Sequence, residues 1–186
     1  MTDLTRRKLL GGAVALSAAY IIPTPSVAGG LTPWPNRIGY DRLWIRNTNG
    51  EQLSLAHWNG RSYDASNCRT LSYLWRDWRD NDAAVMIDPR LFTYLANIQT
   101  RISLSARQPR QLILNSGYRT PRRNATLEGA ARNSEHTRGR AGDFRVEGVR
   151  PSDVHKVAAT LNPHGLGSYT NFTHLDVGGA GRRWNG

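Results

Sequence analysis

The chain has 186 residues, one cysteine and a formal net charge of +11 at neutral pH. A single cysteine excludes an intrachain disulfide, so stability must come from a buried core, which a chain of this length can build as one domain. Cys68 has no adjacent base in the sequence, which argues against a role as nucleophile. The charge comes almost entirely from arginine, which pairs with carboxylates and phosphates, so it favours an anionic partner without selecting one.

Residues 1–28 are typical of an export signal. The pair Arg6-Arg7 precedes a weakly apolar stretch, Leu9–Ile22, that is too short to span a bilayer comfortably. Small residues at Ser26–Ala28 then provide a cleavage site. Paired arginines indicate the twin-arginine route, although an uncleaved membrane anchor is an alternative. We therefore expect a periplasmic protein with one domain over residues 29–186, a net charge of +9 and no stable membrane insertion after signal cleavage.

Two strands and two helices are expected in the first half of the chain. Apolar runs at Leu43–Arg46 and Leu53–Trp58 flank Asn49-Gly50, which is typical of a β-hairpin. A first amphipathic helix is predicted where apolar residues recur at helical spacing, at Leu71, Leu74, Trp75 and Trp78. Asp88-Pro89 predicts the start of a second helix, whose apolar face carries Leu91, Leu95, Ile98 and Ile102.

The next segment holds two expected strands separated by an irregular stretch. Gln111–Asn115 reads as a short buried strand, and Asp143–Val146 as another. Between them, Thr120–Glu135 is rich in arginine, asparagine and glycine, which predicts a loop or a broken helix.

The last segment is expected to close the domain. Ser152-Asp153 predicts the cap of a helix that runs to Leu161, Gly165–Gly167 predicts a turn, and Phe172–Val177 alternates as a closing strand. The predicted fold class is α+β, with helices packed against a small, mostly antiparallel sheet.

His136, Asp143 and His174 are the residues best suited to chemistry. Two imidazoles and one carboxylate are a ligand set that zinc accepts, with a fourth position left open for water. Gly139 lies between the first two and lets the chain turn tightly, so both side chains can face one point. Each of the three also has an ordinary reading as a capping or hydrogen-bonded residue. Asp176 lies two residues after His174 and projects from the same face of the expected strand.

Four motifs occur in order along the chain: Ser116-Gly117-Tyr118-Arg119-Thr120, Asn133-Ser134-x-His136-x-x-Gly139-x-Ala141-x-Asp143-Phe144, Gly165-x-Gly167-x-Tyr169 and Phe172-x-His174-x-Asp176-x-Gly178. Together they resemble the zinc D-Ala-D-Ala peptidase family, most closely its murein endopeptidase K branch. The resemblance runs from about Leu43 to Trp184 and implies a hedgehog/D-Ala-D-Ala-peptidase-like fold.

The resemblance implies one zinc ion, Zn2+, held by the two histidines and the aspartate named above. It implies that Arg119 contacts the substrate near the scissile carbonyl, where a guanidinium can neutralise a developing oxyanion. Pairing of Arg119 with a structural carboxylate is the alternative. Tyr118, Ser134 and Tyr169 are the other residues that the resemblance places against the substrate.

The general base does not follow from the resemblance. Several relatives carry a Glu, Asp or His two or three residues before the last zinc ligand, where this chain has Phe172 and Asn171, which cannot take a proton at neutral pH. Asp176 is the available substitute, although it could instead orient a zinc-bound histidine. Glu135 is a third candidate.

The function expected from the sequence is that of a periplasmic zinc metallopeptidase that hydrolyses peptide cross-links of peptidoglycan. Its partners would be peptidoglycan stem peptides, with no nucleic acid involved. A D,D-carboxypeptidase that trims terminal D-alanine and a non-catalytic, zinc-stabilised peptidoglycan-binding protein are the alternatives. The sequence leaves open the oligomeric state and which cross-link is cut, that from D-alanine to diaminopimelate or that between two diaminopimelates.

Overall fold

The computed structural model describes residues 39–186 as one α+β domain. The expected export signal over residues 1–28 and the start of the domain at residue 29 lie outside the described residues. Within the described part of the chain, none of the helices has the length and apolar character needed to cross a membrane.

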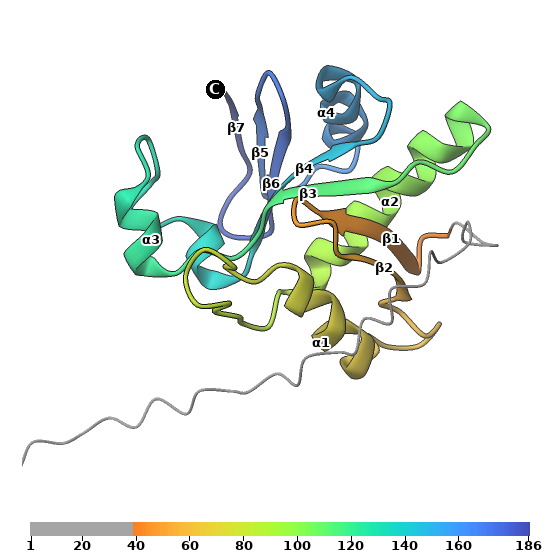
Figure 1. Ribbon diagram of the computed structural model, residues 1–186. Coiled ribbons are helices and arrows are strands. Elements are labelled where there is room, and N and C mark those ends of the chain that lie inside the picture. Colours follow the sequence, from red (N-terminus) through yellow and green to blue (C-terminus); the bar gives the residue numbers. More distant parts are fainter. Residues whose placement is uncertain (1–38) are drawn as a thin grey trace, which may run out of the picture.

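A seven-stranded sheet forms the centre of the molecule, in the order β2-β1-β3-β4-β6-β5-β7 (Figure 1). The strands are β1 (Arg42–Asn47), β2 (Gln52–Ala56), β3 (Leu112–Ser116), β4 (Ala141–Val146), β5 (Gly165–Ser168), β6 (Thr173–Asp176) and β7 (Arg182–Asn185). The expected hairpin is confirmed as the antiparallel pair β1–β2.

The sheet is mixed, and the prediction of a mostly antiparallel sheet was wrong. β1 pairs with β3 in parallel, and β5 pairs with β7 in parallel. Two helices intervene between β2 and β3, and such a long crossover lets β3 run in the same direction as β1. The second parallel pair involves β7, a strand that the sequence did not lead us to expect.

Four α-helices and one short 3-10 helix complete the domain: α1 (Ala65–Leu74), α2 (Pro89–Ala106), α3 (Pro121–Thr126), η1 (Glu135–Arg138) and α4 (Pro151–Ala159). α2 and α4 pack against each other and against strands of the sheet (Figure 1). The core lies between these layers, where the rings of Trp75 and Phe92 meet at 5.2 Å between centroids and Phe144 is also fully buried.

Two helix boundaries differ from the prediction. α1 begins earlier than expected because the side chain of Asp64 caps it by accepting a hydrogen bond from the amide of Asn67, and Trp75 already lies at its C-terminal cap. Trp78 lies beyond the helix and is 40% exposed. α4 starts at Pro151 and not at the predicted Ser152-Asp153 cap, since proline favours the first helical position.

The predicted turn at Gly165–Gly167 is instead the strand β5. A Cβ atom at Gly165 would overlap the carboxylate of Asp176 on the neighbouring strand. Glycine is therefore needed here for close approach of two strands, and its presence does not mark a turn. The stretch Thr120–Glu135 contains the short helix α3 followed by a loop, so the expectation of a loop or broken helix is confirmed.

Candidate metal centre

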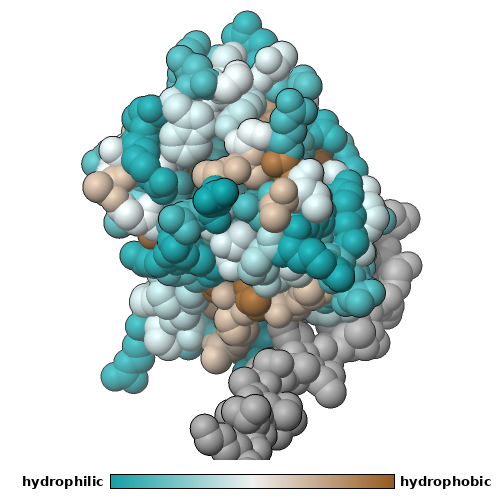
Figure 2. All heavy atoms as spheres, turned by 90° about the vertical axis from the view of Figure 1, so that its left-hand side faces the viewer, coloured by the Kyte–Doolittle hydropathy of each residue, from teal (hydrophilic) through white to brown (hydrophobic). Residues whose placement is uncertain are grey.

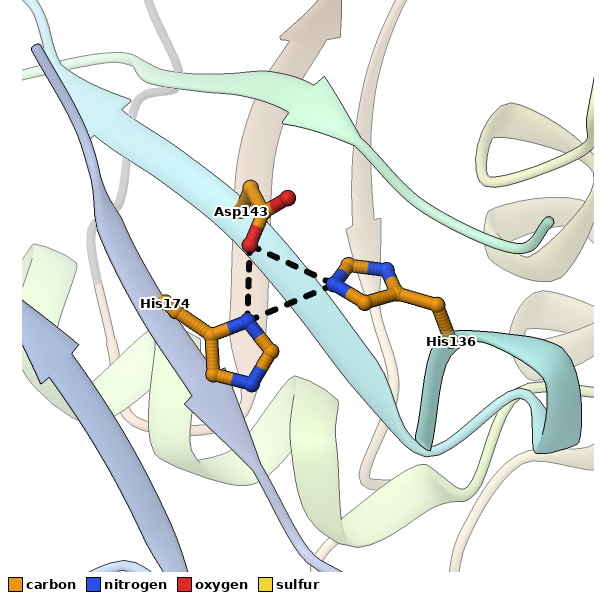
Figure 3. A group of neighbouring side chains, drawn as sticks. All are labelled: His136, Asp143 and His174. Atoms are coloured by element: carbon orange, nitrogen blue, oxygen red, sulfur yellow. Dashed lines mark hydrogen bonds and ion pairs between the residues drawn. The ribbon is translucent and has the colours of Figure 1, made fainter. Parts of the chain in front are cut away.

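Three different elements bring the expected ligands together. His136 lies in η1, Asp143 on β4 and His174 on β6 (Figure 3). β4 and β6 pair with Asp143 directly opposite His174, so both side chains project from the same face of the sheet. Gly139 ends η1 in a left-handed conformation with φ of 66° and turns the chain into β4, which confirms the tight turn expected there.

The three side chains meet at hydrogen-bonding distances. Nδ1 of His174 lies 2.8 Å from Oδ1 of Asp143, and Nε2 of His136 lies 3.3 Å from the same oxygen. The two ring nitrogens are 3.3 Å apart. His136 and Asp143 are buried, and the side chain of His174 is only 12% exposed. These residues form a group that could hold a metal ion.

In each imidazole, the nitrogen that points away from the three-residue cluster contacts an acceptor, and this contact determines which nitrogen carries the proton. Nδ1 of His136 lies 2.6 Å from the carbonyl oxygen of Gly117, which can only accept, so this nitrogen donates. Nε2 of His174 lies 3.3 Å from Oδ2 of Asp176 and donates in the same way. In the neutral rings, Nε2 of His136 and Nδ1 of His174 are then lone-pair acceptors that face a carboxylate. Three buried acceptors facing one point suit a metal cation.

The electrostatics of the site agree with this donor set. Burial alone would raise the pKa of Asp143, but the charges and hydrogen bonds of His136 and His174 outweigh it and hold that pKa well below its ordinary value. Burial would lower the pKa of His174, whereas its contacts with Asp143 and Asp176 raise it. The site therefore favours ionised carboxylates and a positive charge between them.

Asp176 contacts His174 on the side of the ring that faces away from Asp143. Its carboxylate, which also lines the cleft described below, accepts hydrogen bonds from the amide of Gly178 and from Arg182, both at 3.0 Å, and only 1% of the residue is exposed. Burial would raise the pKa of Asp176, but His174, Gly178 and Arg182 together lower it. The geometry is that of a group that orients a ligand histidine.

Arg119 lies beside the other oxygen of Asp143. Its Nη2 donates to Oδ2 of Asp143 at 2.7 Å and its Nε donates to Oγ of Ser116 at 3.0 Å. Arg119 thus makes the carboxylate pairing that the sequence offered as an alternative, and it also lines the cleft described next. Glu135, the third candidate base, forms ion pairs with Arg138 and Arg140.

A cleft of about 930 Å³ opens over the three ligand residues. Arg119, Ser134 and Tyr169 line it, and their contact with substrate stays a prediction. Tyr118 is not among its lining residues and borders a separate small pocket beside Asp77, so its proposed contact with substrate stays a prediction.

Three aromatic residues line one side of the cleft, and the sequence analysis missed one of them, Trp184. Phe172 stacks on Tyr169 with ring centroids 4.4 Å apart, and the ring of Trp184 lies 5.1 Å from that of His174. Trp184 is on β7, and its Nε1 donates to the hydroxyl of Tyr169 at 3.0 Å. Tyr169 and Phe172 belong to the motifs seen in the sequence, but the only signal for Trp184 was an aromatic residue in an arginine-rich tail, which does not predict strand pairing.

The arrangement of the site is that of a metal-dependent hydrolase: two histidines and an aspartate, each oriented by a further contact, at the base of an open cleft. Comparison with known proteins gives the family. A family model described as peptidoglycan L,D-endopeptidase MepK matches residues 40–184.

Named relatives cover nearly the whole chain. The peptidoglycan L,D-endopeptidase MepK of Escherichia coli strain K12 is 40% identical over 98% of both chains. A probable peptidoglycan L,D-endopeptidase MepK of Haemophilus influenzae is 37% identical over 99% of this chain and 97% of its own length. The chain therefore belongs to the MepK family of peptidoglycan L,D-endopeptidases, which confirms the resemblance seen in its motifs. No solved structure matches it, and the hedgehog-like fold stays a prediction.

Proposed function

We propose that the chain is a peptidoglycan endopeptidase that depends on one zinc ion and acts in the periplasm after twin-arginine export. The observation that carries the proposal is the convergence of Nε2 of His136, Oδ1 of Asp143 and Nδ1 of His174 at the base of a cleft. The printed names of the relatives support a peptide cross-link of peptidoglycan as the substrate. The arginine pair near the N-terminus supports the export route.

His136, Asp143 and His174 would hold the zinc ion. When bound, zinc supplies Lewis-acid chemistry, since it polarises a carbonyl and lowers the pKa of water toward neutrality. Two imidazole nitrogens and one carboxylate oxygen match the ligands of catalytic zinc sites, which keep one position open.

The remaining residues bind and orient. Arg119 presents Nη1, which has no hydrogen-bond partner among the described residues, and this group can neutralise negative charge on the substrate carbonyl. Asp176 holds His174 in the tautomer whose Nδ1 faces the ligand cluster, and we assign it this positioning role over that of general base. Ser134 and Tyr169 lie on the lining of the cleft, where a stem peptide would contact them.

The substrate is proposed to be the cross-link that joins an L-configured centre to a D-configured one, that is, the link between two diaminopimelates. The relatives' designation as L,D-endopeptidases favours this bond over the D-alanine-to-diaminopimelate link. It also favours an endopeptidase over a D,D-carboxypeptidase, which would release single D-alanine residues from linear stem peptides.

Digestion of defined cross-linked muropeptides tests this function. The wild-type chain should contain zinc and should convert dimers to monomers, whereas His136→Ala should lose both metal and activity. His155→Ala is the matched control, because His155 lies on α4, away from the cleft. Added zinc should raise the melting temperature of the wild type and leave that of His136→Ala unchanged. Equal cleavage by wild type and His136→Ala would contradict the proposal, and so would cleavage that survives complete removal of metal.

A further inference from the structure

Four arginines line the cleft, and three of them are already bound to carboxylates. These pairs are Arg119 with Asp143 at 2.7 Å, Arg123 with Asp77 at 3.0 Å and Arg182 with Asp176 at 3.0 Å. Arg79 is the fourth, and its guanidinium makes no hydrogen bond or ion pair with any residue that the structure describes. Among the four cleft arginines, Arg79 is therefore the one that forms no ion pair with a carboxylate of the described residues.

The loop that carries Arg79 is held firmly in place. It follows α1 and is docked onto the N-terminus of α3, where Oδ2 of Asp77 accepts a hydrogen bond from the amide of Thr120 at 3.0 Å. Asp80 accepts from the hydroxyl of Thr120 and also pairs with Arg122. Asp77 is only 2% exposed, so this attachment is shielded from water. The backbone under Arg79 is therefore fixed at the edge of the cleft.

The side chain of Arg79 is ordered by an aromatic neighbour. Its guanidinium carbon lies 3.9 Å from the ring centroid of Trp78, a cation–π contact that reduces the number of conformations available to a long side chain. A side chain that is ordered before binding loses less entropy when a ligand arrives. Stacking on the ring face leaves the edge of the guanidinium, which carries its hydrogen-bond donors, free for a ligand, and Arg79 lines both the cleft and the small pocket beside Asp77.

Arg79, which is exposed, has no carboxylate of its own among the residues that the structure describes. Burial lowers the pKa of Arg79, and the nearby charge of Arg123 lowers it further, while Asp77 opposes both. Asp77 is already engaged by Arg123, so two guanidiniums share one carboxylate. Glu128 also lines the cleft but is exposed and makes no ion pair with Arg79. The outer face on the side of α3 is mainly hydrophilic, as expected for a surface that receives a polar ligand (Figure 2).

We propose that Arg79 binds a free carboxylate of the cross-linked peptide and thereby makes the enzyme selective for substrates that carry this carboxylate. The proposal rests on the proposed function. Guanidinium groups bind carboxylates through two parallel hydrogen bonds, which gives both affinity and orientation. With the aromatic wall of Tyr169, Phe172 and Trp184 also lining the cleft, a cationic anchor at Arg79 would set the direction in which the peptide lies across the ligand residues.

The test compares two substrates and four proteins. The substrates are a cross-linked muropeptide dimer with free diaminopimelate carboxylates and the same dimer with these groups amidated. The proteins are the wild type, Arg79→Gln, Arg79→Lys and Arg61→Gln. Arg61 is an exposed arginine that does not line the cleft, so Arg61→Gln removes the same charge without touching the site.

We expect the kcat/KM of the wild type to be at least about tenfold higher for the free acid than for the amide. A charge-assisted hydrogen bond typically changes a binding constant by about this factor. Arg79→Gln should lose this preference through a higher KM for the acid, with the amide cleaved as before. Arg79→Lys should keep part of the preference, because lysine supplies the charge without the paired donors. Arg61→Gln should behave as the wild type.

Two results would overturn the role of Arg79: a wild type that does not distinguish acid from amide, or an Arg79→Gln variant that keeps the full preference. Melting temperature and bound zinc are measured for every variant, and Arg79→Lys decides the question if Arg79→Gln is unstable. If the wild type cleaves neither dimer, the proposed function fails, but binding of the free carboxylate by Arg79 can still be tested with the uncleaved dimer. In that case, calorimetric affinity for the uncleaved free acid should fall tenfold or more in Arg79→Gln, and equal affinity would refute it.

Discussion

Both ring nitrogens of His174 contact a carboxylate, and these two contacts fix the tautomer of the ring. Nδ1 faces Asp143 at 2.8 Å, and Nε2 faces Asp176 at 3.3 Å. A proton on Nε2 leaves the lone pair of Nδ1 directed toward the ligand cluster. Asp176 is in turn fixed by the amide of Gly178 and by Arg182, so the orientation of the ring depends on a chain of contacts behind it.

Replacing Asp176 by asparagine separates its two candidate roles. If Asp176 orients His174, Asp176→Asn should weaken zinc binding by roughly 10–100-fold, and activity should recover substantially when zinc is raised to saturation. Competition with a chromophoric chelator measures the affinity, and muropeptide cleavage at saturating zinc measures the activity. Normal zinc affinity combined with a kcat that stays low at saturation would instead identify Asp176 as the general base.

The sequence predicted that three candidate ligand residues converge, and the structure brings them together, whereas several contacts around them could not be read from the sequence. A motif specifies that His136, Asp143 and His174 occur at certain spacings, and those residue types already restrict the chemistry. The partner of the far ring nitrogen of His136 depends on the fold, since Gly117 lies 19 residues away. The aromatic residue Trp184 reaches His174 only because β7 returns to the sheet beside β5.

At the scale of elements, the N-terminus of α2 supports the turn between η1, which carries His136, and β4, which carries Asp143. The side chain of Asp88 accepts a hydrogen bond from the amide of Arg90 and caps the helix, with Pro89 at its first position. The backbone amide of Asp88 donates to the carbonyl of Gly139 at 2.9 Å, just after η1. The predicted start of this helix is confirmed, because capping signals are local and can be read from adjacent residues.

Removing the cap of α2 should destabilise the protein without removing the metal site. Asp88→Ala should lower the free energy of unfolding by about 1 kcal/mol relative to Asp88→Asn, since asparagine also caps helices well. Both variants lose the ion pair with Arg90, so the difference between them reports the cap alone. Urea denaturation gives the free energies, and zinc content should be the same in both proteins. Equal stability of the two variants would show that the cap contributes nothing.

Strands were harder to predict than helices in this chain. The sequence of β5 predicts a turn because glycines such as Gly165 commonly form turns. In the structure, Gly165 lies in a strand, where the absence of a side chain makes room for Asp176. β7 has an exposed, arginine-rich sequence and forms at the edge of the sheet by pairing with β5. The formation of β7 depends on pairing with a strand that is distant in sequence, so no local pattern predicts it.

At the scale of the whole molecule, a buried histidine outside the cleft links stability to pH. His57 follows β2, is 1% exposed, and contacts the hydroxyl of Thr93 on α2 at 3.2 Å. Burial lowers the pKa of His57 to about 4, with a smaller opposing effect from Asp41. The neutral ring is therefore favoured in the folded state, while the unfolded chain takes up a proton near pH 6.5. The stability that His57 contributes is present above pH 6.5 and is lost as the pH falls toward 4.

A variant without this titration should be less sensitive to acid. Between pH 7 and pH 4, the free energy of unfolding of the wild type should fall by on the order of 2 kcal/mol more than that of His57→Gln. Glutamine keeps a polar group within reach of Thr93 and does not titrate. Chemical denaturation at a series of pH values measures the difference. Parallel pH profiles for the two proteins would contradict the prediction, whatever their absolute stabilities.

The sequence by itself determined the three candidate ligand residues, the hairpin, the start of α2 and the family, because each of these is encoded in residues close together or in motifs that keep their spacing. Only the tertiary structure decided the mixed sheet, the pairing of Asp143 with His174 and the absence, among the described residues, of a carboxylate bound to Arg79. These features depend on partners far apart along the chain: Asp77 lies 46 residues from the Arg123 that it neutralises, and Asp143 lies 31 residues from His174. Charge matching and strand pairing are set by which segments meet in space, and that is fixed by the packing of the whole domain.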